Sequence, residues 1–262
     1  MTRLYLGLET SGTDKLLGGG RIDAACLSAA ILWDRRRGHF RRWSIPKVVH
    51  LGLDSGGFHR AVREHDFPFT PKDLHGLALR LDAEWVATMD YPCEPGVLRP
   101  NRETNSKRIE RTVARAAECL ALGGVNWLPV IQGFTEAEYL DCISRLESIH
   151  AVRGWMGVGT LCARKDLRAT RRILQVVHRA LPEVRLHGFG VDLRLLKDRE
   201  IRWLLFSADS QAWHFMSRPL ARRFGRTLVQ NDEEKIAAFS DYRDRTDRVL
   251  QDHPRAALEA FA

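Results

Sequence analysis

Three apolar runs of the sequence each end in an aspartate, and these aspartates are the residues best placed to do chemistry. The runs are Val48–Asp54, Trp85–Asp90 and Ile201–Asp209. We interpret each run as a buried strand that delivers its acid to the carboxyl end of a sheet. Gly56 and Gly57 follow the first run and let the backbone turn sharply and approach a ligand closely. The pattern predicts carboxyl groups converging on one pocket, where different burial would leave one ionised and let another carry a proton.

The elements that would position these acids alternate between strands and helices. Thr70–Asp73 and Thr135–Glu138 predict helix starts, and the periodicity predicts further helices over residues 105–122 and 166–180. Short strands lie between them, with glycines and polar residues at their ends. This alternation implies a parallel sheet, and 262 residues fit a (β/α)8 barrel of the TIM type. An open doubly wound sheet is the alternative, although no G-x-G-x-x-G follows the first strand.

The remaining segments are assigned around this barrel. We expect a barrel domain over residues 1–230 and a charged helical segment over 231–262 that packs on its outside. The amino terminus is interpreted as the first strand and not as a signal peptide. Residues 22–33 are predicted to be helical, and the basic run Arg35–Arg37 is predicted to lie in a turn.

Composition limits the class of partner and the compartment. The chain carries 41 Lys and Arg against 33 Asp and Glu, a formal net charge of +8, which favours a polyanionic partner. A basic protein without a nucleic-acid role is the alternative. The five cysteines lie far apart without a C-x-x-C pair, which predicts neither a disulfide framework nor a zinc knuckle. No apolar run reaches membrane-spanning length, so we expect a cytoplasmic protein with no membrane partner.

Several motifs resemble, in order along the chain, those of the tRNA-guanine transglycosylases. They are Asp54–Phe58, Ile131–Phe134, the pair Gly157 and Gly159, and Phe206–Ser210. The resemblance is closer to the deazapurine DNA-modification (DpdA-like) branch of that superfamily. The strings shared with this branch are Asp90–Pro95, Gly157–Arg164, His187–Val191 and Ser207–Trp213. Together they span roughly residues 4 to 215, which is most of the chain.

The resemblance implies a barrel that cleaves the N-glycosidic bond of a nucleotide in a polynucleotide and exchanges its base. By position, Asp209 would be the nucleophile that attacks C1′, Asp54 the general acid and base, and Asp90 a hydrogen-bond partner of the flipped base. The base pocket would also include Gln132, Gly133, Gly157, Gly159, Ser55, Gly56, Phe58 and His187. Breaking a C1′–N bond develops oxocarbenium character, which an ionised carboxylate captures while a second carboxyl group protonates the departing base.

Two departures from the family pattern bear on the substrate. The zinc site that usually follows the nucleophile in enzymes acting on tRNA has no counterpart after Cys162. We therefore expect the barrel without the zinc-binding subdomain, no metal or other cofactor, and DNA in place of tRNA. The glutamate expected after the glycine pair is also missing, and Cys162–Arg164 stands there instead, which puts recognition of a guanine-like base in question.

Simpler interpretations exist for several of these residues. Aspartates at strand ends can cap the following helix, and a histidine such as His187 at the end of a buried strand can be a core residue. Cys93 and Cys162 are interpreted as packing residues. Trp213 is either a stacking surface for a base or part of the core.

Basic residues near the predicted pocket are candidates for phosphate contacts. They are Arg164, Lys165, Arg168, Arg218, Arg222 and Arg223. The first three begin a helix at the carboxyl end of a strand, where barrels keep their chemistry. Phosphate contact predicts binding that weakens steeply with added salt, whereas a solvated surface predicts no such effect.

These observations favour an enzyme that flips a nucleotide of double-stranded DNA, or takes one from a single strand, and inserts a free 7-deazaguanine derivative. One alternative is a DNA glycosylase that excises a modified base from phage DNA, leaving an abasic site as in anti-phage defence. Another is a barrel that binds nucleic acid without catalysis. A metal-dependent hydrolase would need histidines beside the acids, and His50 and His187 do not make a convincing set.

Overall fold

Parallel strands close into a barrel in the computed structural model, which describes residues 2–8, 22–42, 48–58, 66–95, 103–162, 164, 166–213 and 232–251. The strands are β1 (Arg3–Leu8), β2 (Ala24–Ser28), β5 (His50–Asp54), β6 (Trp85–Ala87), β7 (Trp127–Leu128), β8 (Val130–Ile131), β9 (Trp155–Val158), β10 (Arg185–Gly188) and β11 (Ser207–Ser210). Their order in the sheet is β7-β6-β5-β2-β1-β11-β10-β9-β8.

Closure of the barrel depends on one short segment. β7 and β8 stand at opposite ends of the sheet order, yet they are two halves of the segment Trp127–Ile131 on either side of Pro129. β7 pairs with β6, and β8 pairs with β9. Counting the two halves as one strand turns the nine strands of this sheet into eight. The predicted (β/α)8 architecture is therefore confirmed in the described part of the chain.

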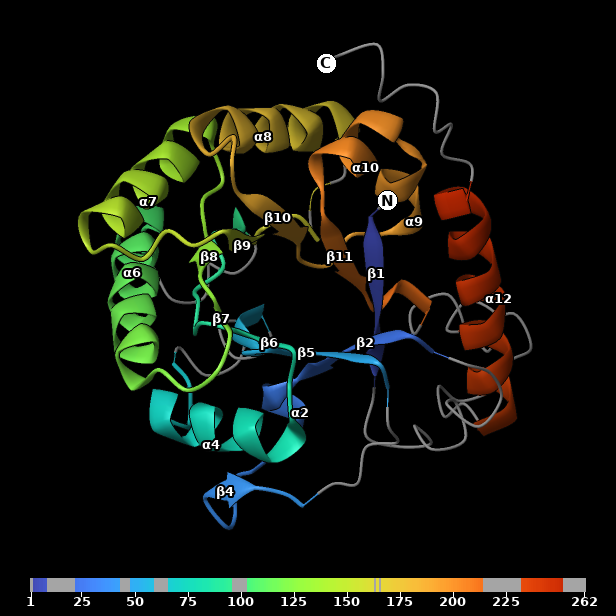
Figure 1. Cartoon of the computed structure of the whole chain (residues 1–262), viewed down its shortest axis with the longest axis horizontal. Helices are drawn as coiled ribbons and strands as arrows, with labels where there is room; N and C mark the ends of the chain where they lie inside the picture. Colours follow the sequence, from blue (N-terminus) through green and yellow to red (C-terminus); the bar gives the residue numbers. More distant parts are fainter. Residues whose placement is uncertain are drawn as a thin grey trace.

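Helices surround these strands as a ring (Figure 1). They are α2 (Ala29–Leu32), α4 (Pro71–Leu81), α6 (Asn105–Leu122), α7 (Glu136–Ser148), α8 (Leu167–Ala180), α9 (Leu193–Lys197), α10 (Arg199–Leu204) and α12 (Asp232–Gln251). The predicted starts of α4 and α7 are confirmed as capping boxes at Thr70 and Thr135. Within the described residues, no helix is long and apolar enough to cross a membrane.

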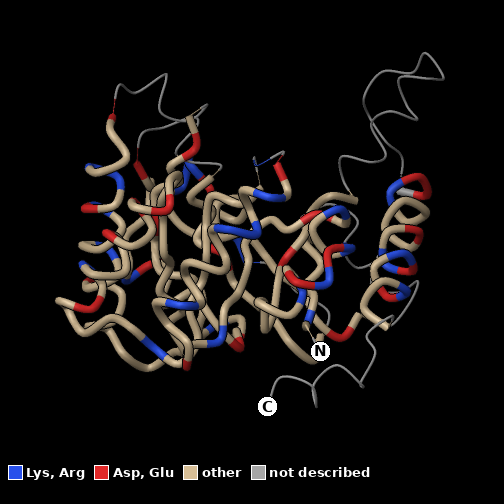
Figure 2. The backbone as a smooth tube through the Cα atoms, turned by 90° about the horizontal axis from the view of Figure 1, so that it is seen from above, with Lys and Arg blue, Asp and Glu red and all other residues tan. Residues whose placement is uncertain are grey.

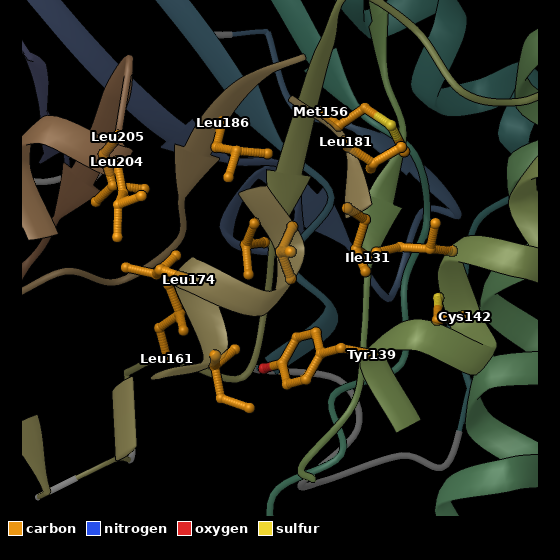
Figure 3. Close-up of a cluster of buried hydrophobic side chains, with 14 of the residues drawn as sticks. Ile131, Tyr139, Cys142, Met156, Leu161, Leu174, Leu181, Leu186, Leu204 and Leu205 are labelled. Carbon is orange, nitrogen blue, oxygen red and sulfur yellow. The ribbon is translucent and has the colours of Figure 1, made fainter. Parts of the chain in front are cut away.

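Alternation of side chains separates the inside of the barrel from its outer layer. On β1, Tyr5 points inward to a cluster with Trp85 and Val130, whereas Leu6 and Leu8 point outward to a cluster under the helices. The outer core between strands β8–β10 and helices α7, α8 and α10 is drawn in Figure 3. Aromatic side chains fill the middle of the barrel, and one cavity lies above them, toward the carboxyl ends of the strands.

The helix α12 packs against α9 and carries acidic and basic residues along its length (Figure 2). Phe239 and Tyr242 are buried in the outer core, and the Tyr242 hydroxyl lies 2.8 Å from Ser210 Oγ on β11. Trp213 is also buried there, and its indole N–H donates to the Gly7 carbonyl oxygen at 2.8 Å. Of the two interpretations of Trp213, the structure therefore supports the core residue.

Two predictions of secondary structure are wrong. The sequence predicts a helix over residues 22–33, but they form β2 and only one helical turn, α2. Central barrel strands buried on both faces are continuously apolar, so their sequences resemble those of buried helices. The run Ile201–Asp209 is not one strand, because its first half belongs to α10 and only Ser207–Ser210 is extended. Arg35–Arg37 lies in the turn between β3 (Trp33–Asp34) and β4 (His39–Phe40), as predicted.

Candidate active site

One pocket lies inside the carboxyl end of the barrel and has a volume of about 420 Å³, within the range of small-molecule sites. Its wall includes five carboxyl groups, those of Asp54, Asp90, Glu94, Asp192 and Asp209. The three aspartates singled out in the sequence therefore meet at one pocket. Asp54 ends β5, Asp209 lies within β11, and Asp90 lies three residues beyond β6.

Asp54 is held at the bend after β5. Its Oδ2 accepts the backbone N–H of Gly56 at 3.1 Å. Gly56 has a φ of 84°, and a Cβ at this position would clash with Ala30, so the bend requires glycine. Burial, together with the negative charges of Asp90 and Asp209, raises the pKa of Asp54 well above 3.8. A carboxyl group with these surroundings keeps its proton to a higher pH than a carboxyl group in water.

Asp90 receives hydrogen bonds on both carboxylate oxygens. The Ser55 hydroxyl donates to Oδ1 at 2.9 Å, and the Gln132 amide donates to Oδ2 at 2.5 Å. Burial raises the pKa of Asp90 to about 6, although these two donors oppose the shift. Above that pH Asp90 is an ionised acceptor whose two oxygens are held in place by Ser55 and Gln132. Such a group is suited to accept hydrogen bonds from N–H groups of a ligand.

The direction of this hydrogen-bond network follows from the carboxylate of Asp90. An ionised carboxylate can only accept, so the amide nitrogen of Gln132 must face Asp90 Oδ2. Gln132 Oε1 then accepts the proton of the Thr160 hydroxyl at 2.6 Å, and Thr160 Oγ accepts the N–H of Cys93 at 3.0 Å. Asp90 thus fixes which end of Gln132 meets it.

Gly159 leaves the space in which the Gln132 amide lies, which leads to a prediction. A Cβ at Gly159 would lie inside van der Waals contact with the amide of Gln132. We expect Gly159→Ala to displace that amide and raise the pKa of Asp90 above about 6, by about 1 unit for one lost charge-assisted bond. The shift is measured by NMR titration of the Asp90 carboxyl carbon.

A matched control is Gly76→Ala on α4, where nothing lies within 4 Å of the added Cβ. This variant should leave the Asp90 titration unchanged. An Asp90 pKa that is the same in wild type, Gly159→Ala and Gly76→Ala would contradict the assigned role of Gln132.

Asp209 is held by one of its two oxygens. The N–H of Gly190 donates to Oδ1 at 3.0 Å, and Nε2 of His187 lies 3.4 Å from the same oxygen. Oδ2 has no hydrogen bond with any residue that the structure describes. The side chain is 13 % exposed and lines the pocket. One oxygen of this carboxylate is therefore anchored while the other can meet a ligand.

Five of the other eight residues predicted for the base pocket line it or lie directly behind its wall. Gln132, Gly159 and Phe58 line the pocket, with Phe58 45 % exposed. Ser55 and Gly56 lie behind the wall and hold Asp90 and Asp54, respectively.

Three predicted base contacts lie away from the pocket. Gly133 contacts the backbone at the start of α7, and Gly157 lies against the ring of Phe189. His187 is fully buried below Asp209 and does not reach the pocket wall. Gly157 and His187 pair on β9 and β10 in the layer below the pocket, whereas Gly133 follows Gln132 beyond β8 and packs outward against α7.

Sequence reasoning missed Glu94. It is 3 % exposed, it lines the pocket, and its Oε2 has no hydrogen-bond partner among the described residues. Burial raises the pKa of Glu94. Cys162, interpreted as a packing residue, instead lines the pocket and donates its S–H to Glu94 Oε1 at 3.5 Å, whereas Cys93 is buried as expected. The signal available was an acid four residues after Asp90 in the same motif.

The predicted phosphate contacts are only partly described. Arg164 turns inward, where its guanidinium donates to the carbonyl oxygens of Thr160 and Phe134. Arg168 is exposed on the first turn of α8. Four others lie outside the described residues: Lys165, Arg218, Arg222 and Arg223. In the described part of the chain, no group of three or more His, Cys, Asp and Glu side chains could hold a metal ion.

Comparison with known proteins adds a family to this geometry. The family DpdA, described as DeoxyPurine in DNA protein A, matches residues 24–239. The chain belongs to the DpdA family. This is a DNA-modification family similar to the tRNA-guanine transglycosylases, and the resemblance drawn from the motifs is thereby confirmed. A search of curated proteins found no match.

Membership has two consequences for the pocket. The DpdA family implies a transglycosylase-like enzyme that acts on DNA. The matched range contains Asp54, Asp90 and Asp209, so the pocket lies wholly within the part of the chain that carries the family pattern.

Proposed function

We propose that this protein exchanges a base in DNA for a 7-deazaguanine derivative through a covalent sugar ester on Asp209. The observation that carries the proposal is that Asp209 Oδ2, which no described residue hydrogen-bonds, shares the pocket with Asp54, a second carboxyl group whose pKa burial raises. A nucleophile and a proton donor in one pocket are the two groups that cleavage of a glycosidic bond requires.

In the first step, Oδ2 of Asp209 attacks C1′ of a nucleotide flipped into the pocket. The C1′–N bond breaks, its electron pair goes to the base nitrogen, and Asp54 gives that nitrogen its proton. The base leaves neutral, and the sugar stays attached to DNA on one side and to Asp209 on the other. Asp90, whose oxygens accept from Ser55 and Gln132, takes N–H groups of the base.

In the second step, the ionised Asp54 removes a proton from the nitrogen of an incoming 7-deazaguanine derivative. That nitrogen attacks C1′, and the ester bond to Asp209 breaks to restore its carboxylate. The DNA backbone remains intact throughout. If water takes the place of the incoming base, the same ester yields an abasic site, which is the glycosylase alternative.

The experiment incubates the protein with duplex and single-stranded DNA carrying ¹⁵N-labelled bases, with and without a free 7-deazaguanine derivative. Digested nucleosides are then measured by mass spectrometry. Exchange predicts release of a labelled base together with incorporation of the deazapurine. Alkali-labile sites that form without added base would instead establish hydrolysis, and neither product would leave only a DNA-binding role.

Arg168 provides a test of the DNA interface. It is exposed where α8 begins, on the pocket side of the barrel, and we expect it to contact a phosphate. Arg168→Ala should reduce the slope of log Kd against log salt by about 1. Arg153→Ala is the control, since Arg153 is exposed before β9, at the opposite end of the barrel. Equal slopes for both variants would remove Arg168 from the interface.

A further inference from the structure

A buried histidine lies directly beneath the proposed nucleophile. His187 is 0 % exposed, its Nε2 is 3.4 Å from Asp209 Oδ1, and its Nδ1 is 2.8 Å from Ser207 Oγ. We propose that His187 is a positioning residue that, oriented by Ser207, holds Oδ1 of Asp209 so that Oδ2 faces C1′. This proposal rests on the proposed function, in which Asp209 is the nucleophile.

Strand register brings the three side chains together. His187 on β10 pairs directly with Ser207 on β11. Ser207 and Asp209 are two residues apart on the same strand, so both side chains point to the inside of the barrel. His187 therefore has Ser207 beside it and Asp209 diagonally above it, toward the carboxyl ends of the strands. The arrangement is a property of the sheet and does not depend on a loop.

The chemistry of the three groups fixes the direction of their contacts. An ionised carboxylate can only accept, so the proton of a neutral imidazole must be on Nε2 to interact with Asp209. Nδ1 is then an acceptor, and the Ser207 hydroxyl must donate to it. Ser207 thus selects the ring tautomer in which Nε2–H points at the nucleophile.

The surroundings keep the ring in this place. The rings of Trp85, Phe189 and Tyr5 lie 4.6, 4.7 and 5.8 Å from the imidazole, measured between ring centres. An aromatic cluster of this kind needs no nitrogen for packing, and burying a polar ring costs free energy unless it makes hydrogen bonds. Packing alone therefore does not account for a histidine here, whereas contacts of its two nitrogens with Ser207 and Asp209 do.

The contact with Asp209 is long in the free protein. Among the described residues Nε2 makes no hydrogen bond of good geometry, and 3.4 Å exceeds the usual N–H···O distance. Contacts of catalytic groups commonly tighten when substrate binds. With Gly190 N–H on the same oxygen at 3.0 Å, tightening would clamp Oδ1 from two sides and leave Oδ2 to react.

The test compares His187→Phe, which keeps a ring and loses the donor, with His187→Gln, whose amide nitrogen can replace Nε2–H. His178→Phe on α8 is the control, because the ring of His178 contacts that of Trp203 and does not line the pocket. We expect His187→Phe to slow formation of the Asp209–DNA ester by about 100-fold, the effect of a 1 Å misplacement. DNA affinity should stay unchanged, and His187→Gln should recover at least about tenfold.

A second measurement does not depend on catalysis. The tautomer of His187 is determined by NMR of protein labelled with ¹⁵N-histidine, and the signal of His187 is the one that disappears in His187→Gln. The Nε2–H tautomer is expected, and Ser207→Ala should mix it with the other form. A Nδ1–H tautomer in the wild type, or wild-type ester formation in a folded His187→Phe, would overturn the positioning role. Failure of the proposed function is separate, because it would appear as no Asp209–DNA ester in the wild type, or as full base release in Asp209→Asn.

Discussion

Replacing Asp209 by asparagine is expected to abolish base release, with a loss of at least about 10³-fold, because an amide cannot form the sugar ester. The fold should survive, since the amide oxygen of the new side chain can still accept the Gly190 N–H that now binds Oδ1. DNA binding should also remain, because the substitution removes no positive charge. The rate is measured by quantifying free base released from labelled DNA.

Intact-protein mass spectrometry gives the second measurement for this variant. Wild-type protein trapped with DNA and no incoming base should carry a DNA adduct, and peptide mapping should place the adduct on Asp209. Asp241→Asn is the matched control, since Asp241 is an exposed acid on α12 that does not line the pocket. An adduct of equal yield in Asp209→Asn would contradict the assignment of the nucleophile.

Replacing Asp54 by asparagine is expected to lower the rate of base release by about 10²- to 10⁴-fold, the usual contribution of a general acid. Burial and the charges of Asp90 and Asp209 raise the pKa of Asp54, so the wild-type carboxyl keeps its proton well above pH 3.8. The wild-type rate should therefore fall as pH rises through that pKa. The variant has no proton to lose at this position, so its lower rate should lack this decline.

The same substitution should change stability with a definite sign. The folded-state pKa of Asp54 lies above 3.8, so between 3.8 and that pKa unfolding releases a proton. Wild-type stability from this group is fully present below pH 3.8 and is lost as pH rises through the folded pKa. Asp54→Asn should therefore gain stability relative to wild type as pH rises above about 4 and until the folded-state pKa of Asp54 is passed, as measured by urea unfolding.

Asp198 provides a control of opposite sign. Although burial acts to raise it, the ion pair with Arg171 lowers the pKa of Asp198. Its stabilising contribution is present above 3.8 and is lost as pH falls through the folded pKa. Asp198→Asn should thus be less stable than wild type at about pH 7. A stability difference for Asp54→Asn that does not grow with pH would show that this carboxyl is not buried as proposed.

Helices and their caps could be predicted from local sequence patterns, because both depend on residues that are close in sequence. Thr70 and Thr135 begin α4 and α7, and residues 105–122 form α6 as predicted. The same local view failed at residues 22–33, since a strand buried on both faces has no alternating pattern. It also joined α10 and β11 into one strand, because the apolar residues Trp203–Phe206 connect them and no glycine or proline separates them.

The sequence by itself was enough to predict the barrel class, to select the three aspartates as site residues and to show the resemblance to a DNA-modification family. These follow from residue type, spacing and motif order, which are properties of the chain alone. Tertiary structure decided that Trp127–Ile131 closes the barrel, that Glu94 and Cys162 enter the pocket wall, and that His187 lies below Asp209. The physical reason is register: side chains from strands distant in sequence share a layer of the barrel only once hydrogen bonding fixes how those strands are offset.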